Sequence, residues 1–336
     1  MPTALVTGCA GFIGSHLSER LLADGYRVIG LDNFDPFYDR SLKRTNLTGS
    51  LSNTNFVFHE LDLRAGPVAL AAVLGSETVD VVVHLAAKAG VGPSVQEPAS
   101  YLEANVLGTV HLLEWMRLTG VKNLFFASSS SVYGNTTELP FREDMNLLST
   151  CISPYAASKL SAEQFTFTYH HLYQLNVLNA RFFTVYGPRQ RPDLAIHKFT
   201  RLLLSGQPIP MYGDGSTARD YTFVADTVDG IARGVAYLLT HPGTYEIINL
   251  GNSSPIKLHD LIVAVGEAVG VVPMLDLRPM QAGDVETTYA DSSKARQLLG
   301  YAPQTTLPEG LRQFVQWLQE TDGALSSIPM SSAQAV

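Results

Sequence analysis

A tyrosine and a lysine stand four residues apart in the segment SPYAASK, which spans residues 153–159. Ser153 followed by Pro154 is typical of a helix start. Tyr155 and Lys159 are therefore expected on one face of that helix. A free tyrosine has a pKa near about 10, too high for a base at neutral pH, but a neighbouring ammonium favours the phenolate and lowers that pKa. This pair would remove and return a proton, whereas an amphipathic helix with a surface lysine is the structural alternative.

Four consecutive serines, Ser128 to Ser131, occur in FFASSSSVYG. The apolar residues 123–127 before them are expected to form a buried strand, which would place the hydroxyls at its carboxyl end. One of these hydroxyls would hold a substrate oxygen while its proton leaves. A solvated serine-rich loop is the alternative.

Three glycines, Gly8, Gly11 and Gly14, follow a predicted strand and open a helix in VTGCAGFIGSHL. A turn without side chains lets a pyrophosphate approach backbone N–H groups at the positive end of a helix. Asp32 ends the next strand, where its carboxylate would accept both hydroxyls of an adenosine ribose, although a capping or loop role is the alternative. Because Asn33 rather than a basic residue follows, NAD is favoured over NADP.

Asp62 follows the third predicted strand in ELDLR. It is a candidate neighbour of the adenine, with a simple strand-end turn as the alternative.

The elements that must position these residues alternate along the first half of the chain. Continuous apolar segments such as VDVVVHLAA are typical of parallel strands covered by helices on both faces. We expect an α/β fold, a Rossmann-type doubly wound parallel sheet, over residues 1–185. Residues 186–322 would form mainly a smaller C-terminal α/β substrate lobe, with some segments returning to the first domain, and residues 323–336 a frayed tail. The expected strands span residues 3–7, 27–31, 55–60, 79–85 and 123–127, and helices begin near Phe12, Ala65, Ala99 and Pro154.

The composition excludes several classes of partner. The chain has 336 residues and a formal net charge of −8 at pH 7, so it lacks the broad basic face that nucleic acid or an anionic membrane needs. Its apolar runs fall short of the roughly 20 residues that span a bilayer. The two cysteines, Cys9 and Cys151, lie far apart, which argues against a disulfide or a thiolate metal site. We expect a cytoplasmic protein without a metal.

The glycine turn, Asp32, the serine strand end and the Y-x-x-x-K pair together resemble the extended short-chain dehydrogenase/reductase family, over roughly residues 3–320. The resemblance implies NAD in the first lobe and a nucleotide sugar in the second. It also implies that Ser129 is the catalytic hydroxyl, Tyr155 the base, and Lys159 its partner and a nicotinamide-ribose ligand. The cofactor contacts that it implies, besides Tyr155 and Lys159, are Gly8, Gly11, Phe12, Ile13, Gly14, Asp32, Asn33, Asp62, Leu63, Leu85, Ala86, Ala87, Lys88, Asn105, Ser128 and Phe182.

The same resemblance implies a set of substrate contacts. Thr184 lies in RFFTVYG, the family's strand at the sugar, and Arg219 in STARDYTFV corresponds to its diphosphate-binding arginine. The full set is Ser129, Ser130, Ser131, Tyr155, Thr184, Arg191, Arg219 and Asp284.

The reaction class follows from the residues just before Val-Tyr-Gly. Family members that carry out 4,6-dehydration or decarboxylation place acidic residues there, whereas this chain has Ser130 and Ser131. A serine is a poor general acid or base beside a carboxylate, so a second proton transfer lacks its agent. The expected outcome is a C4 epimerisation, in which a transient 4-keto sugar is re-reduced on its other face and tightly bound NAD is regenerated.

The segments LDNFDPFYDRSLKRTNL and RFFTVYGPRQRPDLAIHKF most resemble the UDP-glucuronate 4-epimerases. Arg191 would then pair with the uronate carboxylate; a phosphate contact or a solvated charge is the alternative. Gly92 replaces an arginine that such enzymes carry, and Gln281 stands where many neutral-sugar epimerases have an arginine. A UDP-glucose or UDP-N-acetylglucosamine 4-epimerase is therefore the alternative. A UDP-glucuronate decarboxylase and a non-catalytic NAD-binding scaffold are less favoured.

The helices expected over residues 99–119 and 154–173 carry apolar residues on more than one face, including Trp115 and Phe165. Relatives of this kind pair these helices in a four-helix interface. A homodimer is therefore expected.

Overall fold

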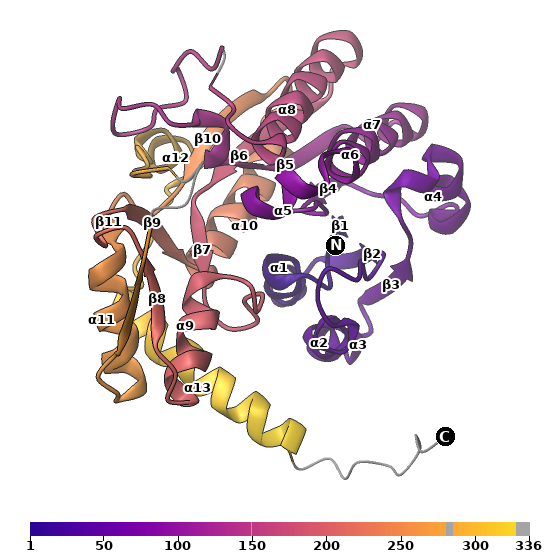
Figure 1. Cartoon of the computed structure of the whole chain (residues 1–336). Helices are drawn as coiled ribbons and strands as arrows, with labels where there is room; N and C mark the ends of the chain where they lie inside the picture. Colours follow the sequence, from indigo (N-terminus) through magenta and orange to yellow (C-terminus); the bar gives the residue numbers. More distant parts are fainter. Residues whose placement is uncertain (149, 280–284, 327–336) are drawn as a thin grey trace.

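The computed structural model describes residues 1–148, 150–279 and 285–326, and its centre is a seven-stranded sheet (Figure 1). Every neighbouring pair in this sheet is parallel, in the order β10-β6-β5-β4-β1-β2-β3. This arrangement confirms the predicted Rossmann-type fold. The strands are β1 (Thr3–Thr7), β2 (Arg27–Asp32), β3 (Phe56–Glu60), β4 (Val81–His84), β5 (Asn123–Ser129), β6 (Asn176–Phe182) and β10 (Tyr245–Leu250).

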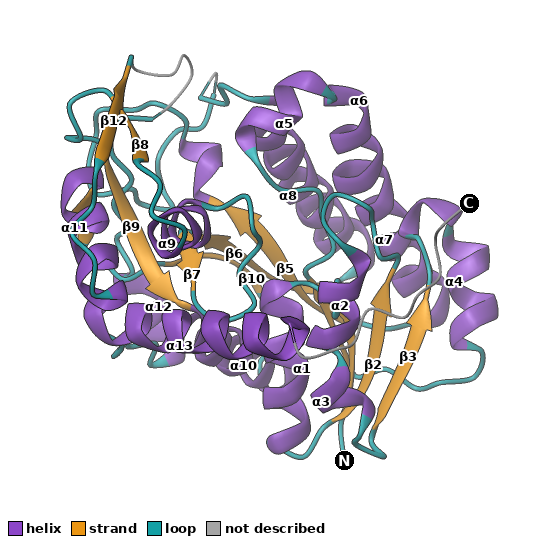
Figure 2. Ribbon diagram, turned by 60° about the horizontal axis from the view of Figure 1, so that its bottom comes forward, coloured by secondary structure: helices purple, strands orange, loops and turns teal. Residues whose placement is uncertain are grey.

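Helices cover both faces of this sheet, because its strands are apolar on both sides (Figure 2). Along β5, Phe125 packs into one hydrophobic cluster, while Leu124 and Phe126 pack into the other. Alternate residues of a strand point to opposite faces, so one continuous apolar run fills two cores. The helices of the first face include α1 (Phe12–Ala23) and α10 (Val224–Thr240), and those of the second α4 (Pro67–Leu74), α7 (Gly108–Thr119) and α8 (Pro154–Tyr173).

The strand order reverses between β1 and β4, which are direct neighbours with Thr7 opposite His84. In open parallel sheets, ligands bind outside the carboxyl ends of the strands at this reversal. The fold therefore places the glycine turn after β1 and the loop after β4 on either side of one crevice.

A second lobe is built from two small sheets, ordered β11-β9-β7 and β12-β8. Two later elements, β10 and α10, return to the large sheet, so residues beyond 185 contribute to both parts of the molecule. The lobe contains β7 (Thr184–Tyr186), β8 (Ile209–Tyr212), β9 (Ala218–Phe223), β11 (Pro255–Lys257), β12 (Leu275–Arg278), α9 (Ala195–Leu204) and α11 (Leu258–Val269).

The shorter helices lie in connections around the large sheet or at its edge. They are α2 (Arg40–Asn46), α3 (Thr48–Leu51), η1 (Leu63–Ala65), α5 (Val91–Gln96), α6 (Pro98–Tyr101), η2 (Leu102–Leu107), η3 (Ser130–Tyr133) and α12 (Ser293–Leu299), with the longer α13 (Leu307–Ser326) at the end of the described chain. Within the described ranges, no helix combines the length and apolar character needed to cross a bilayer.

A buried ion pair joins α8 to β6. Arg181 donates from Nη2 to Glu163 Oε2 at 2.8 Å and from Nε to Oε1 at 3.0 Å, and the two side chains are 2% and 1% exposed. Ser128 at the end of β5 donates to the same Oε1 at 2.5 Å. Tyr133 accepts from Arg181 Nη1 at 3.0 Å. These bonds fix α8 against the carboxyl ends of two central strands.

We predict that Glu163→Gln destabilises the protein by about 3–5 kcal/mol, because it leaves the Arg181 guanidinium buried without a counter-charge. Urea unfolding of the purified protein measures this change. The control is the double variant Glu163→Leu with Arg181→Met, which removes both charges and should recover most of the loss. A Glu163→Gln variant within about 1 kcal/mol of the wild type would show that the pair is not needed for stability.

Candidate active site

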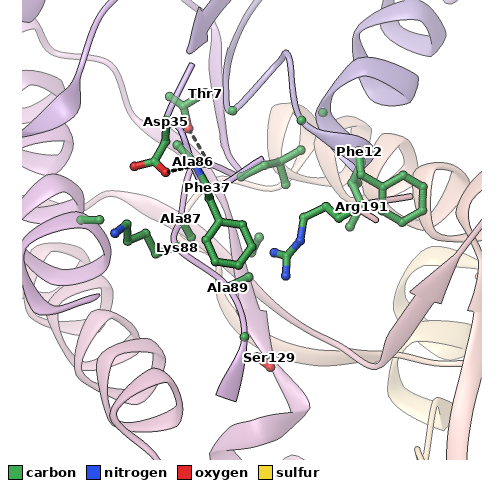
Figure 3. Close-up of a pocket in the computed structure, with 18 of the residues that line it drawn as sticks. Thr7, Phe12, Asp35, Phe37, Ala86, Ala87, Lys88, Ala89, Ser129 and Arg191 are labelled. Carbon is green, nitrogen blue, oxygen red and sulfur yellow. Dashed lines mark hydrogen bonds between the residues drawn. The ribbon is translucent and has the colours of Figure 1, made fainter. Parts of the chain in front are cut away.

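A cavity of about 520 Å³ opens at the carboxyl ends of the central strands and brings most of the predicted site residues together. Figure 3 shows part of its lining, with Arg191 extending toward the ring of Phe37. The predicted residues that line it are Gly8, Gly11, Phe12, Ile13, Gly14, Asp32, Asn33, Asp62, Leu63, Leu85, Ala86, Ala87, Lys88, Ser128, Ser129, Ser130, Ser131, Tyr155, Lys159, Phe182, Thr184 and Arg191.

The glycine turn packs directly on the loop that follows β4. A Cβ on Gly8 would lie 2.8 Å from the backbone nitrogen of Ala86, and Gly8 has a φ of +74°. A Cβ on Gly14 would lie 2.1 Å from the carbonyl oxygen of Gly8. Helix α1 begins at Phe12, and no side chain caps its first N–H groups. Because Phe12, Ile13 and Gly14 line the cavity, these N–H groups border it as in a dinucleotide site. The turn therefore has the shape that a pyrophosphate requires.

Asp32 lies at the end of β2, where two backbone N–H groups hold its carboxylate. Ala10 donates to Oδ2 at 3.1 Å and Phe34 to Oδ1 at 2.8 Å. Burial raises the pKa of this carboxyl, against the lowering effect of the nearby Lys43 ammonium. Each oxygen keeps further acceptor capacity, as a ribose diol would need.

Lys43 in α2 lines the same end of the cavity, and sequence reasoning gave it no role. Its side chain is 6% exposed, and Nζ donates to the carbonyl oxygen of Asp35 at 2.9 Å and lies 4.8 Å from the ring centre of Tyr38. Burial lowers the pKa of this ammonium. No local motif indicated Lys43, because the loop after Asp32 folds back to bring it there.

Asn33 and Asp62 hold each other at the edge of the cavity. Asn33 Nδ2 donates to Asp62 Oδ2 at 2.9 Å, and Arg64 Nη2 donates to the same oxygen at 2.7 Å. The Arg64 guanidinium is the main reason why the pKa of Asp62 falls to about 2. Asp62 is thus ionised at neutral pH and joins the ends of β2 and β3.

The predicted helix start before the tyrosine is confirmed. Ser153 caps α8 by accepting from the backbone nitrogen of Ala156 at 3.1 Å. Tyr155 and Lys159, one turn apart, both line the cavity. Lys159 Nζ donates to the carbonyl oxygen of Ala127 at 2.8 Å, which anchors the helix to β5.

The sequence predicts that the Lys159 ammonium lowers the pKa of Tyr155, but other groups act on this phenol in the structure. Burial raises the pKa of Tyr155, whereas a hydrogen bond with Ser129 and the charge of Arg191 lower it. Burial also lowers the pKa of Lys159 to about 8, against the opposing charge of Glu163. Ser129 and Arg191 are therefore the groups of the described chain that favour the phenolate.

The hydroxyls of the serine run have different partners, although all four serines line the cavity, and the run is not a solvated loop. Strand β5 continues through Ser128 and Ser129, which are 3% and 7% exposed. The hydroxyl of Ser128 donates to Glu163, behind the strand end. The hydroxyl of Ser129 donates to Ser131 Oγ at 3.1 Å and accepts from the Ser131 backbone nitrogen at 3.2 Å. Ser129 is the member of the run that lowers the pKa of Tyr155.

Arg191 reaches the cavity already paired with a carboxylate. Its Nε and Nη2 donate to the two oxygens of Asp193 at 3.0 and 2.7 Å. The guanidinium also lies 4.9 Å from the ring centre of Phe37, which sequence reasoning did not assign to the site. The remaining edge of the guanidinium, at Nη1, is the part that a ligand can use.

Two of the predicted residues that the structure describes do not line the cavity. Asn105 is buried behind it, where its amide binds the backbone of Lys88 from both sides, at 2.8 and 2.9 Å. Arg219 in β9 donates to the carbonyl oxygens of Ala218 and Glu286, at 2.8 and 3.3 Å. Asp284 lies outside the described residues.

Comparison with known proteins gives consistent matches over nearly the whole chain. Residues 5–314 match the family model described as GDP-mannose 4,6 dehydratase. The chain is 41% identical over 325 residues to the UDP-glucuronate 4-epimerase of Thermodesulfobacterium geofontis (strain OPF15), covering 96% of this chain and 98% of that relative.

Solved structures also match. The UDP-glucuronic acid 4-epimerase from Bacillus cereus, in complex with UDP-glucuronic acid and NAD, aligns with a TM-score of 0.88 at 33% identity and covers 95% of this chain and 99% of its own. The UDP-glucose 4-epimerase of Thermotoga maritima, with UDP-glucose, aligns with a TM-score of 0.84 at 31% identity and the same coverage.

We predict that neighbouring serines give different results when changed to alanine. Ser128→Ala should destabilise the fold by about 1–2 kcal/mol, because Glu163 loses a buried hydrogen-bond donor. Ser129→Ala should cost less, about 0.5–1 kcal/mol, because its hydroxyl caps only the short η3 turn through Ser131 and does not bind a buried charge. Urea unfolding of both variants beside the wild type measures the difference. Equal destabilisation by the two changes would contradict this difference between the two hydroxyls.

Proposed function

The chain belongs to the GDP-mannose 4,6 dehydratase-like group of the extended short-chain dehydrogenase/reductase family, and from this premise we propose that it interconverts UDP-glucuronate and UDP-galacturonate by C4 epimerisation with bound NAD. The observation that carries the proposal is the composition of the cavity around Tyr155. Hydroxyls and the Arg191–Asp193 pair lie near this phenol, and the acids that line the described part of the cavity lie at the far end.

The position of the carboxylates follows from the strand order. The acids among the described lining residues, Asp32, Asp35 and Asp62, follow β2 and β3. Strand β5 lies three places from β2 in the sheet, so at about 4.8 Å per strand these ends are about 14 Å apart. No lining acid of the described residues is therefore placed to act at C5, and Asp193 is already paired with Arg191. This supports oxidation and re-reduction at C4 over dehydration.

The roles that we propose for the reacting end follow from the hydrogen bonds. Tyr155 takes the proton of the C4 hydroxyl and later returns it. Ser129, which lowers the pKa of the phenol, holds the same substrate oxygen. Lys159, fixed by the Ala127 carbonyl, binds the nicotinamide ribose. Bound NAD would supply a reversible hydride acceptor. The residues of the glycine turn and Asp32 would hold its pyrophosphate and adenosine ribose.

For the sugar acid, we propose that Arg191 binds the carboxylate through Nη1, and that Thr184 at the start of β7 contacts the sugar. Holding this carboxylate matters because a 4-keto uronate is a β-keto acid that can lose CO₂. The bonds to Asp193 fix the orientation of the guanidinium but also offset its charge. That offset favours a second candidate, a UDP-glucose 4-epimerase, whose substrate carries no carboxylate.

Gly92 in α5 replaces the arginine expected of uronate epimerases. A Cβ there would meet no heavy atom within 4 Å, so this departure leaves open space next to the cavity residues Gly90 and Val91. The other departure, Gln281, lies outside the described residues.

We further propose a cytoplasmic homodimer that pairs the α7 and α8 regions of two copies. Apolar side chains of α8 reach solvent, with Phe165 39%, Phe167 48% and Leu172 57% exposed. On the neighbouring helix, Leu118 is 63% exposed. Both cysteines are free thiols, which supports a reducing compartment.

We predict that the purified protein converts UDP-glucuronate into UDP-galacturonate without release of CO₂. Incubation with UDP-glucuronate, UDP-glucose and UDP-N-acetylglucosamine, followed by chromatography, measures the products. Tyr155→Phe is the negative control and should lower kcat by about 100-fold or more, because the phenol that accepts the C4 hydroxyl proton is removed. Tyr101→Phe changes a tyrosine whose ring lies 6.1 Å from that of Tyr155 and should retain activity.

The absence of UDP-galacturonate, with epimerisation of a neutral UDP-sugar, would establish the second candidate. Formation of a UDP-pentose and CO₂ would overturn the inference from the missing carboxylates.

We predict that Arg191→Met raises the KM for UDP-glucuronate by about 10- to 100-fold, because a charge-assisted bond to the carboxylate is lost. Turnover of UDP-glucose, if detectable, should change by less than about threefold. Asp193→Asn is the matched variant, since it keeps the side-chain shape and frees guanidinium charge, and it should lower the KM for UDP-glucuronate. Initial rates over a substrate series measure both. An equal loss for acidic and neutral sugars in Arg191→Met would argue for a diphosphate contact.

A further inference from the structure

His84 ends β4 beside the residue that precedes the glycine turn. It pairs with Thr7 of β1 across the point where the strand order reverses. The imidazole is 2% exposed, and both of its nitrogens are hydrogen-bonded. Nδ1 lies 2.7 Å from Thr7 Oγ1, and Nε2 lies 2.9 Å from Thr109 Oγ1 on α7. A buried polar ring at this position requires an explanation.

The partners of the two threonines determine which nitrogen carries the proton. Thr109 Oγ1 donates to the carbonyl oxygen of Asn105 at 2.6 Å, and a carbonyl can only accept. The Thr109 hydroxyl has thus used its hydrogen, so His84 Nε2 must be the donor to it. On the other side, Thr7 Oγ1 accepts from the backbone nitrogen of Ala86 at 3.2 Å and gives its own hydrogen to His84 Nδ1. Every donor in this series therefore has an acceptor only if the imidazole is neutral and carries its hydrogen on Nε2.

Two further observations support the neutral ring. Burial lowers the pKa of His84 to about 3, and the charge of Lys159 adds to this effect. A second proton, on Nδ1, would make this nitrogen a donor to Thr7 Oγ1. The hydroxyl hydrogen of Thr7 would then lose its acceptor. Phe126, in contact with the ring at 5.7 Å between centroids, offers no polar alternative.

The chain continues from Asn105 to both walls of the cavity. Asn105 lies in the π-helical stretch η2 between α6 and α7, and such wide turns are frequent at functional sites. Its amide accepts from the Lys88 backbone nitrogen at 2.8 Å and donates to the Lys88 carbonyl at 2.9 Å. The second amide hydrogen goes to Ser158 Oγ at 2.9 Å, and Ser158 donates to the Tyr155 carbonyl at 2.8 Å.

We propose that His84 is a positioning residue whose neutral, Nε2-protonated ring is the central link of a one-way hydrogen-bond chain from Ala86 to the Asn105 carbonyl. This chain fixes Asn105, whose side chain joins Lys88 to the first turn of α8. The chain sets three parts of the cavity wall relative to one another, although His84 itself lines none of it. The expected effect on nucleotide binding rests on the proposed function. The protonation of His84 on Nε2 is independent of that function.

The first experiment measures the tautomer in the wild-type protein. Long-range proton–nitrogen NMR on protein labelled with ¹⁵N-histidine should show a pyridine-like Nδ1 and a pyrrole-like Nε2 for His84, unchanged between about pH 5 and about pH 8. The signal is assigned by its loss in His84→Gln. An Nδ1–H tautomer, or a ring that gains a proton in this range, would overturn the proposal whether or not the protein is active.

The second experiment interrupts the chain at Thr109, which has no contact with the cavity. Thr109→Val removes the hydroxyl at nearly constant shape, while Thr109→Ser keeps it. We expect Thr109→Val to shift the backbone amide signals of Ala86 and Lys88 and to raise the Kd for NAD, measured by calorimetry on nucleotide-free protein, by about tenfold. Thr109→Ser should resemble the wild type in both measurements.

Equal amide shifts in the two Thr109 variants would refute the positioning role. If the amides respond as expected but the wild type binds no NAD, the proposed function fails and the chain of bonds stands. Should Thr109→Val not fold, His84→Asn keeps an acceptor near Nδ1 and loses the Nε2 donor, so it should disturb Lys88 more than Ala86.

Discussion

The ion pair between Glu163 and Arg181 is the interaction on which the chemistry-bearing part of the molecule depends. Two charges withdrawn from water are stable only where each is fully hydrogen-bonded, and here Ser128 and Tyr133 complete the set. The pair is central because it joins one helix to two strands at the level of the site. The position of Tyr155 over the end of β5 follows from that junction.

The same polar network continues to β10 at the edge of the large sheet. Tyr133 donates to Asn249 Oδ1 of β10 at 2.7 Å, and the amide of Asn249 donates to the carbonyl oxygens of Phe141 and Asp291 at 2.9 and 3.1 Å. Each group in this series has a partner, so the network can stay buried without a large penalty. The network thereby ties the edge strand β10, and the segments that contain Phe141 and Asp291, to the catalytic helix.

The order of the strands also separates the acids that line the described cavity from Tyr155, and Lys43 and Arg64 accompany those acids. Asp32 and Asp62 lie at the ends of β2 and β3, while Lys159 and Arg191 lie near the end of β5 and beyond. A dinucleotide placed across the reversal point would have its adenosine on the acidic side and its reacting end among hydroxyls and cations. One edge of a parallel sheet can thus hold a cofactor and limit the chemistry to a single proton-transfer group.

The sequence alone determined the features that depend on neighbours along the chain: the parallel sheet from its apolar runs, the glycine turn, and the helix start that aligns Tyr155 with Lys159. Their signals are local, because backbone conformation and helix spacing act over a few residues. Only the tertiary structure decided which hydroxyl of the serine run binds Glu163, that Asp193 already pairs with Arg191, and that Asn105 supports the site from behind. These outcomes depend on side chains brought together from distant segments or by the folding of a loop, and no spacing in the sequence encodes such contacts.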